Sequence, residues 1–219
     1  MIPQGTFTLP IWFDLGATFA FGLTGALAGI KRGYDIVGLF FLALACGLGG
    51  ALLRDGVFLP SKDPTPLLTD PRYIQAILLA TVAGALFGRH VKRFRRTIAL
   101  IDALGLGAYA AFGTQKALQA GIAAPAAVLV GVINASGGGL VRDIITRLEP
   151  LVFKPGQFYV LTAVAGSITF VFLTVQEGFS ATLSAMIAIV VTIVFRFLAI
   201  LFNWRTTAVA PVEEQDLTP

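Results

Sequence analysis

The sequence predicts an all-α integral membrane protein with seven transmembrane helices. Of its 219 residues, 56% are hydrophobic and only 13% are charged, whereas a soluble domain carries about 25% charged residues. Seven apolar runs have about the 20 residues that a helix needs to cross a bilayer. The runs do not alternate polar with apolar residues as barrel strands do. They lie at residues 10–30, 36–53, 71–88, 97–118, 122–141, 157–176 and 180–204.

The first three runs each carry a recognisable polar or proline position. Asp14 interrupts the run 10–30, and no basic region precedes it, so we expect no cleavable signal peptide. The run 36–53 ends in glycines followed by Arg54 and Asp55, and the run 71–88 opens at Pro71.

The next four runs reuse the same features. Asp102 and Lys116 lie near the two ends of the fourth run, and the fifth contains the stretch "SGGGLVRDI". The sixth run follows Pro155, and the seventh has no earlier counterpart. The last fifteen residues, 205–219, are polar and acidic, so we expect a disordered tail.

An internal repeat with an offset of 88 residues relates the two parts of the chain. Asp14 matches Asp102, and the pair Arg54-Asp55 matches Arg142-Asp143. Other matches are Gly25 with Gly113, Gly33 with Gly121, and Gly49-Gly50 with Gly137-Gly138. Each copy holds three spans, so the second copy enters the membrane from the opposite face. The sequence therefore predicts a 3+3 inverted repeat, residues 10–92 and 97–176, with a seventh helix at 180–204. Inverted repeats commonly place a transport site near the bilayer midplane.

The distribution of Lys and Arg predicts the orientation. Alternate loops place eleven of these residues on one face and four on the other, leaving out Arg196 within the last span. By the positive-inside rule the richer face is cytoplasmic. We expect a multi-pass cell membrane protein with its N-terminus outside and its C-terminus in the cytoplasm. The basic run "GRHVKRFRR" is then a topology anchor first and an anionic-lipid site second.

The two glycine clusters are the first candidate functional residues. Glycine weakens a helix by about 1 kcal/mol relative to alanine, so we expect both helices to break there and to expose backbone carbonyls. Broken helix is tolerated in a membrane only against protein or a water-filled cavity. The alternative is close packing, a common use of small residues between membrane helices. The candidate pore and hinge residues are Gly47, Gly49, Gly50, Gly137, Gly138 and Gly139.

The charges beside these glycines are the second candidates. Intramembrane ionisable residues usually have a partner or line a pathway, so we expect Arg54, Asp55, Arg142 and Asp143 to brace the bends and help set a gate. Asp14 and Asp102 could cap a helix, pair with the arginines of the opposite copy, or draw cations toward a pore mouth. Lys116 could snorkel to the interface or sense voltage. Ser136, directly before the glycine triple, is a further secondary candidate.

Several functional classes are excluded. One histidine and one cysteine cannot build a metal-catalytic centre, and no nucleophile–base pair or P-loop is visible, so an enzyme is not expected. Topology explains the net charge of +4, so nucleic acid is not expected as a partner. We expect no cofactor apart from a possible bound lipid.

The paired motifs on the second and fifth spans resemble those of the prokaryotic trimeric intracellular cation (TRIC) channel family, which overlaps with bacterial proteins described as putative glycine transporters. The resemblance implies a homotrimer in which each protomer has its own potassium-permeable pore, lined by spans two and five bent at their glycines. One departure is Ala51, where the second copy has Gly139.

Three functions stay open on the sequence: a passive monovalent cation channel, a secondary transporter of a small solute such as glycine, and a structural or assembly factor of the membrane. The inverted repeat is compatible with both transport functions.

Overall fold

The computed structural model describes residues 8–59, 65–88, 95–153 and 158–206. The regular elements in this part of the chain are helices, as the sequence predicts. Two of them are short π-helical segments, written η. In chain order they are α1 (Trp12–Lys31), α2 (Ile36–Leu53), η1 (Arg54–Phe58), α3 (Pro66–Thr69), α4 (Pro71–Phe87), α5 (Arg95–Gln119), α6 (Ala124–Ile145), α7 (Tyr159–Val171), η3 (Phe172–Gln176) and α8 (Ala181–Leu201).

Seven helical spans correspond to the seven apolar runs. Five are long and apolar enough to cross a membrane, namely α1, α2 with η1, α6, α7 with η3, and α8. The apolar α4 has 17 residues, which at 1.5 Å per residue extend about 26 Å. The 25-residue α5 carries Arg95 and Arg96 at its start. The predicted seven-helix membrane fold is therefore confirmed, and α3 is a short turn of helix before α4.

Local chemistry determines where several helices begin. The side chain of Asp35 accepts a hydrogen bond from the Gly38 N–H at 2.8 Å and caps α2, an arrangement that satisfies an otherwise unpaired amide. Asp70 caps α4 in the same way, and Pro71 follows it at the first helical position, where its missing N–H does no harm. A hydrogen bond from Arg72 also holds the pKa of the Asp70 carboxyl below its usual range.

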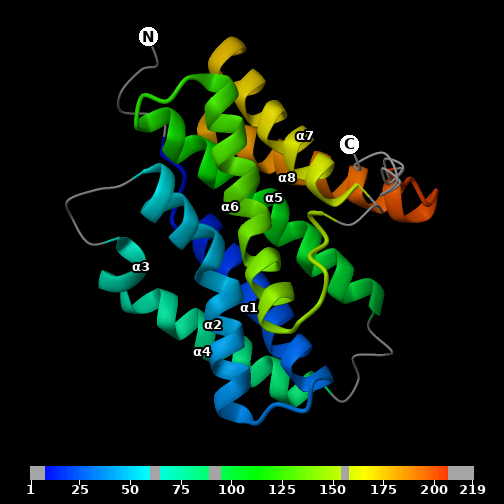
Figure 1. The fold of residues 1–219 in the computed structure, drawn as a ribbon. Helices are drawn as coiled ribbons and strands as arrows, with labels where there is room; N and C mark the ends of the chain where they lie inside the picture. The colour runs from blue at the N-terminus through cyan, green and yellow to red at the C-terminus, as the bar shows by residue number, and fades with distance from the viewer. Residues whose placement is uncertain (1–7, 60–64, 89–94, 154–157, 207–219) are drawn as a thin grey trace, which may run out of the picture.

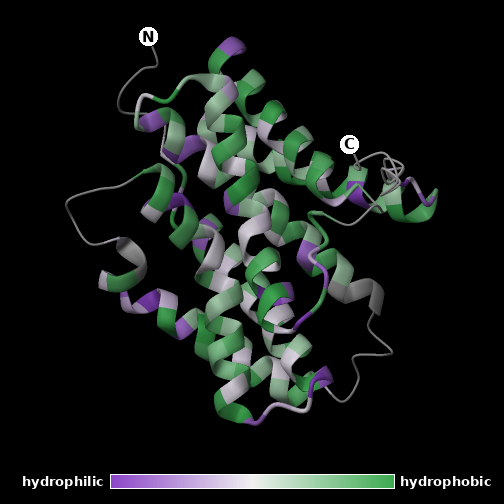
Figure 2. Ribbon diagram, in the orientation of Figure 1, coloured by the Kyte–Doolittle hydropathy of each residue, from purple (hydrophilic) through white to green (hydrophobic). Residues whose placement is uncertain are grey.

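The helices pack as two groups of three with the seventh helix beside the second group. In the first group α1 contacts both α2 and α4, and in the second α5 contacts both α6 and α7. The groups meet where α2 lies against α6 and α1 lies against α5, while α8 packs on α5 and α7 (Figure 1). Most of the helix surface is apolar, with the hydrophilic segments mainly toward helix ends (Figure 2).

Matching backbone conformations support the repeat. Gly33, just after α1, has φ of +75°, and Gly121, just after α5, has φ of +80°. Residues with a Cβ rarely adopt this left-handed region, so glycine is required at both turns. The two turns are 88 residues apart in the sequence, which is the offset of the repeat.

The expected helix breaks at the glycine clusters are absent. The α-helix is continuous through Gly47, Gly49 and Gly50 in α2, and through Gly137 to Gly139 in α6. The departure from α-helical geometry comes one turn later in the first copy, where η1 starts at Arg54. The expectation of broken helices was wrong because the α-helical hydrogen-bond ladder is kept through both clusters. Neighbouring backbone packs closely against Gly47, Gly50, Gly137 and Gly138.

Two sequence predictions fall outside the described residues. They concern the basic run at residues 89–94 and most of the expected acidic tail, residues 207–219, which the structure does not describe. The boundaries 10–92, 97–176 and 180–204 remain predictions.

Candidate functional site

The crossing of α2 and α6 brings the two glycine clusters together. A Cβ added to Gly50 would collide with the backbone carbonyl oxygen of Asn134, and one added to Gly138 would collide with that of Cys46. Gly50 and Gly138 are repeat mates, as are Cys46 and Asn134. The contact is therefore reciprocal, and the pseudo-two-fold axis of the repeat passes through this crossing. A Cβ on Gly137 would lie 2.8 Å from the Gly50 Cα.

The other candidate glycines differ in how tightly they are enclosed. A Cβ on Gly47 would lie 2.8 Å from the Thr18 carbonyl oxygen, and one on Gly49 would lie 3.2 Å from Val141. A Cβ on Gly139 would meet its nearest neighbour, the Tyr159 hydroxyl, at 3.4 Å, an ordinary contact. Close packing, the alternative we set beside a helix break, explains the tight positions. It does not explain Gly139.

Tyr109 of α5 binds the backbone at the crossing. Its hydroxyl donates to the Gly47 carbonyl oxygen at 2.5 Å and lies 2.7 Å from the Thr18 hydroxyl oxygen. The Tyr109 ring stacks on Phe21, its own repeat mate, with 5.4 Å between ring centroids. The sequence analysis missed Tyr109, although a tyrosine standing where the first copy has phenylalanine was a usable signal.

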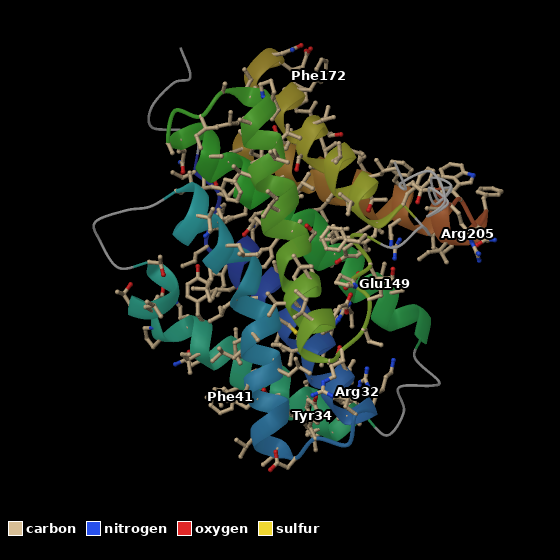
Figure 3. The ribbon with its side chains drawn as sticks, in the orientation of Figure 1. Arg32, Tyr34, Phe41, Glu149, Phe172 and Arg205 are labelled. Carbon is tan, nitrogen blue, oxygen red and sulfur yellow. The ribbon has the colours of Figure 1, made fainter. Side chains whose placement is uncertain are left out.

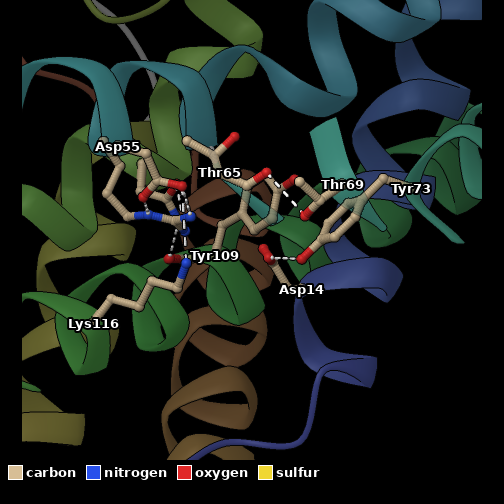
Figure 4. Close-up of polar contacts among 9 residues, drawn as sticks. Asp14, Asp55, Thr65, Thr69, Tyr73, Tyr109 and Lys116 are labelled. Atoms are coloured by element: carbon tan, nitrogen blue, oxygen red, sulfur yellow. Dashed lines mark hydrogen bonds and ion pairs between the residues drawn. The ribbon is translucent and has the colours of Figure 1, made fainter. Parts of the chain in front are cut away.

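At the start of η1, four charged residues form what we call the Arg54 cluster: Asp14, Arg54, Asp55 and Lys116. Arg54 is completely buried and binds Asp55 through two nitrogens, with Nε to Oδ1 at 2.6 Å and Nη2 to Oδ2 at 2.9 Å. Lys116 Nζ lies 3.8 Å from Asp55 Oδ2. Arg54 and Lys116 both act electrostatically on Asp14. Figure 4 shows Lys116 and Asp55 approaching from different helices.

Neutral side chains from neighbouring helices complete this cluster. Arg54 Nη1 donates to Asn134 Oδ1 at 3.3 Å, while Asn134 Nδ2 donates to the Tyr109 carbonyl oxygen at 2.7 Å. Asn134 thus connects η1 with α5. The Phe112 ring lies under both cations, 5.5 Å from Arg54 Cζ and 5.5 Å from Lys116 Nζ, and cations favour the face of an aromatic ring.

Asp14 is held by a tyrosine and not by direct contact with an arginine. The Tyr73 hydroxyl donates to Asp14 Oδ2 at 2.5 Å (Figure 4). The other carboxylate oxygen, Oδ1, is buried and has no hydrogen-bond partner among the described residues. Asp14 therefore makes no ion pair with any described arginine, and no side chain caps the start of α1.

Near the end of α6, the repeat mates Asp102, Arg142 and Asp143, joined by Arg196 of α8, form the Arg142 cluster. Arg142 keeps 15% exposure and donates one hydrogen bond from Nε to Asp143 Oδ1 at 2.9 Å. Asp143 Oδ2 accepts the Leu151 N–H at 3.2 Å. Asp102 is partly buried and interacts electrostatically with Arg142 and Arg196. Each arginine pairs with the aspartate that follows it. Asp14 and Asp102 lie near the arginine of their own copy and not that of the opposite copy, which differs from the pairing expected for them.

Arg196 of α8 is the member of this cluster that the sequence analysis did not single out as a site residue. Its guanidinium carbon lies 5.1 Å from the centroid of the Tyr159 ring. The Tyr159 hydroxyl is buried without a hydrogen-bond partner in the described structure. Tyr159 therefore stands beside Asp102 and Arg196 much as Tyr73 stands beside Asp14, but it makes no comparable hydrogen bond.

A pocket of about 410 Å³ opens beside Arg142. The C-terminal turns of α1 and α6 and the segment after α6 form its walls, including Lys31, Arg32, Arg142, Asp143 and Glu149. Arg32 and Glu149 are labelled in Figure 3. The Arg142 cluster can therefore reach water, whereas the Arg54 side chain is sealed.

The remaining candidates have structural partners. Ser136 donates its hydroxyl to the Val132 carbonyl oxygen, one helical turn back, at 2.7 Å. Lys116 is held by Asp55 and Phe112. Within the described ranges, no three His, Cys, Asp or Glu side chains gather as metal ligands would. Cys46 is buried as a free thiol at the crossing.

The sequence model of a family described as "Glycine transporter" matches residues 11–89 and 99–175. The chain belongs to this family. The two matched segments begin 88 residues apart, the offset found in the repeat. The family and the fold are those of membrane channels and transporters, and not of enzymes.

Two similar proteins are described as membrane proteins, in agreement with this family. The chain is 32% identical to a UPF0126 membrane protein of Deinococcus radiodurans, over 71% of this chain and 72% of that protein. It is 28% identical to the UPF0126 inner membrane protein YadS of Escherichia coli K12, over 90% and 94%.

The fold is also similar to solved TRIC channels. A TRIC trimeric intracellular cation channel orthologue from Rhodobacter sphaeroides superposes with a TM-score of 0.81 at 27% identity, covering 89% of this chain and 98% of the orthologue. A second structure, described for conductance through TRIC cation channels, gives 0.79 at 29% identity, covering 94% and 99%.

Proposed function

We propose that the protein is a potassium-permeable monovalent cation channel, a homotrimer with one pore in each protomer, lined by α2 and α6. Support comes from the fold, since the similar structures are described as cation channels. The trimer is likewise proposed from a similar structure, which is described as a trimeric channel.

The observation that carries the proposal is the charge balance on either side of the α2–α6 crossing. Each of the two clusters holds two cations and two carboxylates. A lone fixed positive charge would repel a passing cation strongly in a low-dielectric surrounding, but Arg54 and Arg142 are both bound to acids. The crossing itself presents glycines and backbone carbonyls, groups that are compatible with a weakly held cation.

The crossing is closed in this arrangement, because backbone atoms of α2 and α6 touch at Gly50 and Gly138. Conduction then requires the two helices to separate along this contact. The carbonyl oxygens of Cys46 and Asn134, which the glycines cover, would face the opened path. Arg54 and Arg142 brace the contact from its two ends.

Planar-bilayer recording of the purified protein tests this proposal. We expect unitary current steps in symmetric potassium chloride, and a reversal potential in a salt gradient that shows cations to be the permeant ions. Current steps carried by chloride, or no steps from protein that is folded and inserted, would count against a cation channel.

A secondary transporter of a small solute such as glycine is the second candidate, because the matching family is described as "Glycine transporter". Uptake of labelled glycine into proteoliposomes separates the two functions. A carrier gives slow uptake that saturates with substrate and no unitary steps.

We also propose an orientation in the cell membrane, with the N-terminus outside and the C-terminus in the cytoplasm, from the eleven-to-four distribution of Lys and Arg. A cysteine introduced at position 63 should react with an impermeant reagent from outside and one at position 93 from the cytoplasm. The reverse pattern would exclude this orientation, and labelling of both from one side would exclude the seven-span topology.

A further inference from the structure

Gly139 of α6 faces a space that is bordered by two hydrogen-bond donors. Its neighbour Gly138 packs against the backbone of α2, but a Cβ on Gly139 would meet only the Tyr159 hydroxyl at 3.4 Å and Arg142 Nη2 at 3.8 Å among the described residues. Tyr159 is the first residue of α7, so the space lies between α6 and α7 and apart from the α2–α6 contact. A hydroxyl and a guanidinium nitrogen both donate hydrogen bonds.

The donors around this space lack acceptors. The Tyr159 hydroxyl and Arg196 Nη1 are buried without a hydrogen-bond partner in the described part of the chain. The Arg196 guanidinium carbon lies 5.1 Å from the centroid of the Tyr159 ring, so both groups belong to one site. Arg142 binds Asp143 through Nε, which leaves Nη2 for a further acceptor. A buried donor without an acceptor costs free energy, so an acceptor from outside the chain would stabilise this arrangement.

In the first copy the corresponding donors have acceptors. Tyr73, near the start of α4, donates its hydroxyl to Asp14 at 2.5 Å. Arg54 binds both carboxylate oxygens of Asp55. The unused donors are therefore a feature of the second copy, where α8 adds Arg196 beside the tyrosine.

The charges around the space leave room for one anion. Asp143 is bound directly to Arg142, whereas Asp102 acts on Arg142 and Arg196 at longer range. Four cationic and three anionic side chains lie around the site and the adjoining pocket of about 410 Å³: Lys31, Arg32, Arg142 and Arg196, and Asp102, Asp143 and Glu149. One monovalent anion would bring these charges into balance. The pocket beside Arg142 is open, so an ion can enter from water.

We propose that the space beside Gly139 is a binding site for a monovalent halide ion, which in a cell is chloride. The Tyr159 hydroxyl, Arg196 Nη1 and Arg142 Nη2 donate hydrogen bonds to it, two of them charge-assisted. Size selects a halide over phosphate or sulfate, because a halide is about as large as the methyl group that Gly139 lacks. A water molecule accepts hydrogen bonds too, but it does not offset the positive charge.

Thermal unfolding of the intact protein in detergent tests the site, with gluconate replaced stepwise by chloride at constant potassium concentration. Chloride at about ten times its dissociation constant should raise the ratio of folded to unfolded protein about eleven-fold. For a chain of this size that is a rise in Tm of roughly 3–6 °C. The rise should saturate, as expected for one site. A Tm that does not change throughout the titration would overturn the proposal.

Two variants and a matched control localise the ion. Gly139→Ala places a methyl group in the space and should abolish the chloride-dependent rise, while in gluconate it should be no less stable than the wild type. Tyr159→Phe removes an unpartnered hydroxyl, so it should reduce the rise without a loss of stability in gluconate. Tyr34→Phe should keep the full rise, because Tyr34 is an exposed tyrosine outside the site. A full rise in Gly139→Ala would place the bound anion elsewhere.

The sign of a charge change separates an anion from a water molecule. Asp102→Asn removes a negative charge near the site, so it should lower the chloride concentration of the half-maximal rise several-fold. An unchanged half-maximal concentration would show that no anion is held here. In crystals grown with potassium bromide, the anomalous signal of bromide should lie beside Gly139, and its absence there would contradict the site. None of these measurements involves ion flux, so their outcome is separate from that of the proposed channel.

Discussion

The Arg54 and Arg142 clusters contain the same Arg-Asp motif but lie in different environments. Arg54 has no exposed surface and binds Asp55 through two nitrogens, with further contacts to Asn134 and Phe112. Arg142 keeps 15% exposure, binds Asp143 through one nitrogen, and borders an open pocket. Burial strengthens an ion pair but also makes a broken pair costly. In the proposed channel, the sealed Arg54 end would stay in place, and the hydrated Arg142 end would be the one to rearrange.

Residues outside the shared motif cause this difference. Arg54 is contacted by Asn134 and Phe112, and its partner Asp55 is contacted by Lys116. The repeat mates of these three contacting residues are Cys46, Thr24 and Ala28, which bear no amide, aromatic ring or charge. One motif on one fold thus gives a sealed brace at one end and a hydrated one at the other, depending on what the partner helices supply.

Arg54→Ala should produce the largest loss of stability. It leaves Asp55 buried with only Lys116 nearby, and removing one partner of a buried ion pair costs about 3–5 kcal/mol. Thermal unfolding in detergent measures the loss. Arg54→Lys should recover only part of it, because an ammonium cannot bind both carboxylate oxygens in the planar geometry of arginine. A loss no larger than that of Arg142→Ala would mean that the two clusters are energetically alike.

Alanine at the crossing should affect both halves equally. In Gly50→Ala and Gly138→Ala the new methyl group meets a backbone carbonyl, so each substitution must push α2 and α6 apart at a cost of about 1–3 kcal/mol or more. If closure depends on this contact, open probability in bilayer recordings should rise in both variants.

Gly139→Ala is the matched control, because its Cβ would make only ordinary contacts. It should stabilise α6 slightly through helix propensity, by up to about 1 kcal/mol, and leave gating unchanged. Equal gating changes in Gly138→Ala and Gly139→Ala would favour helix stiffness over close packing as the role of these glycines.

Arg142→Ala should give the smallest loss of stability, about 1 kcal/mol, the net value of a typical hydrogen bond, since the site is already open to water. Its effect should appear in function, as an altered open probability with the preference among monovalent cations retained. A variant that gated normally but changed ion selectivity would place Arg142 in the ion path.

The sequence was sufficient for the fold and for finding the charged pairs that form the two clusters. Apolar run lengths predicted seven spans, and the 88-residue offset predicted the repeat, because both depend on composition and period and not on atomic detail. The same offset predicted that Arg54-Asp55 and Arg142-Asp143 would occupy related places. The positions of Gly33 and Gly121 agree with it down to the backbone conformation.

The sequence could not show how the glycines are used. A glycine pair weakens an isolated helix, but it also lets the backbone of a second helix pack closely against it. Whether the helix breaks or packs depends on which other helix crosses it at the glycines. For Gly50 that neighbour is Asn134, 84 residues away. Tyr109, Asn134 and Arg196 were missed for a related reason, since each is isolated in the sequence and becomes part of a site only through tertiary contacts.

The reciprocal contact at the crossing has a consequence for how the molecule tolerates change. Gly50 meets the residue at position 134 and Gly138 meets the residue at position 46, as in the isologous interface of a two-fold dimer, where residue i touches j and j touches i. In a true homodimer every substitution would appear twice at such an interface. Because both halves are joined in one chain, each side varies separately, and the chain carries Asn134 on one side of the axis and Cys46 on the other.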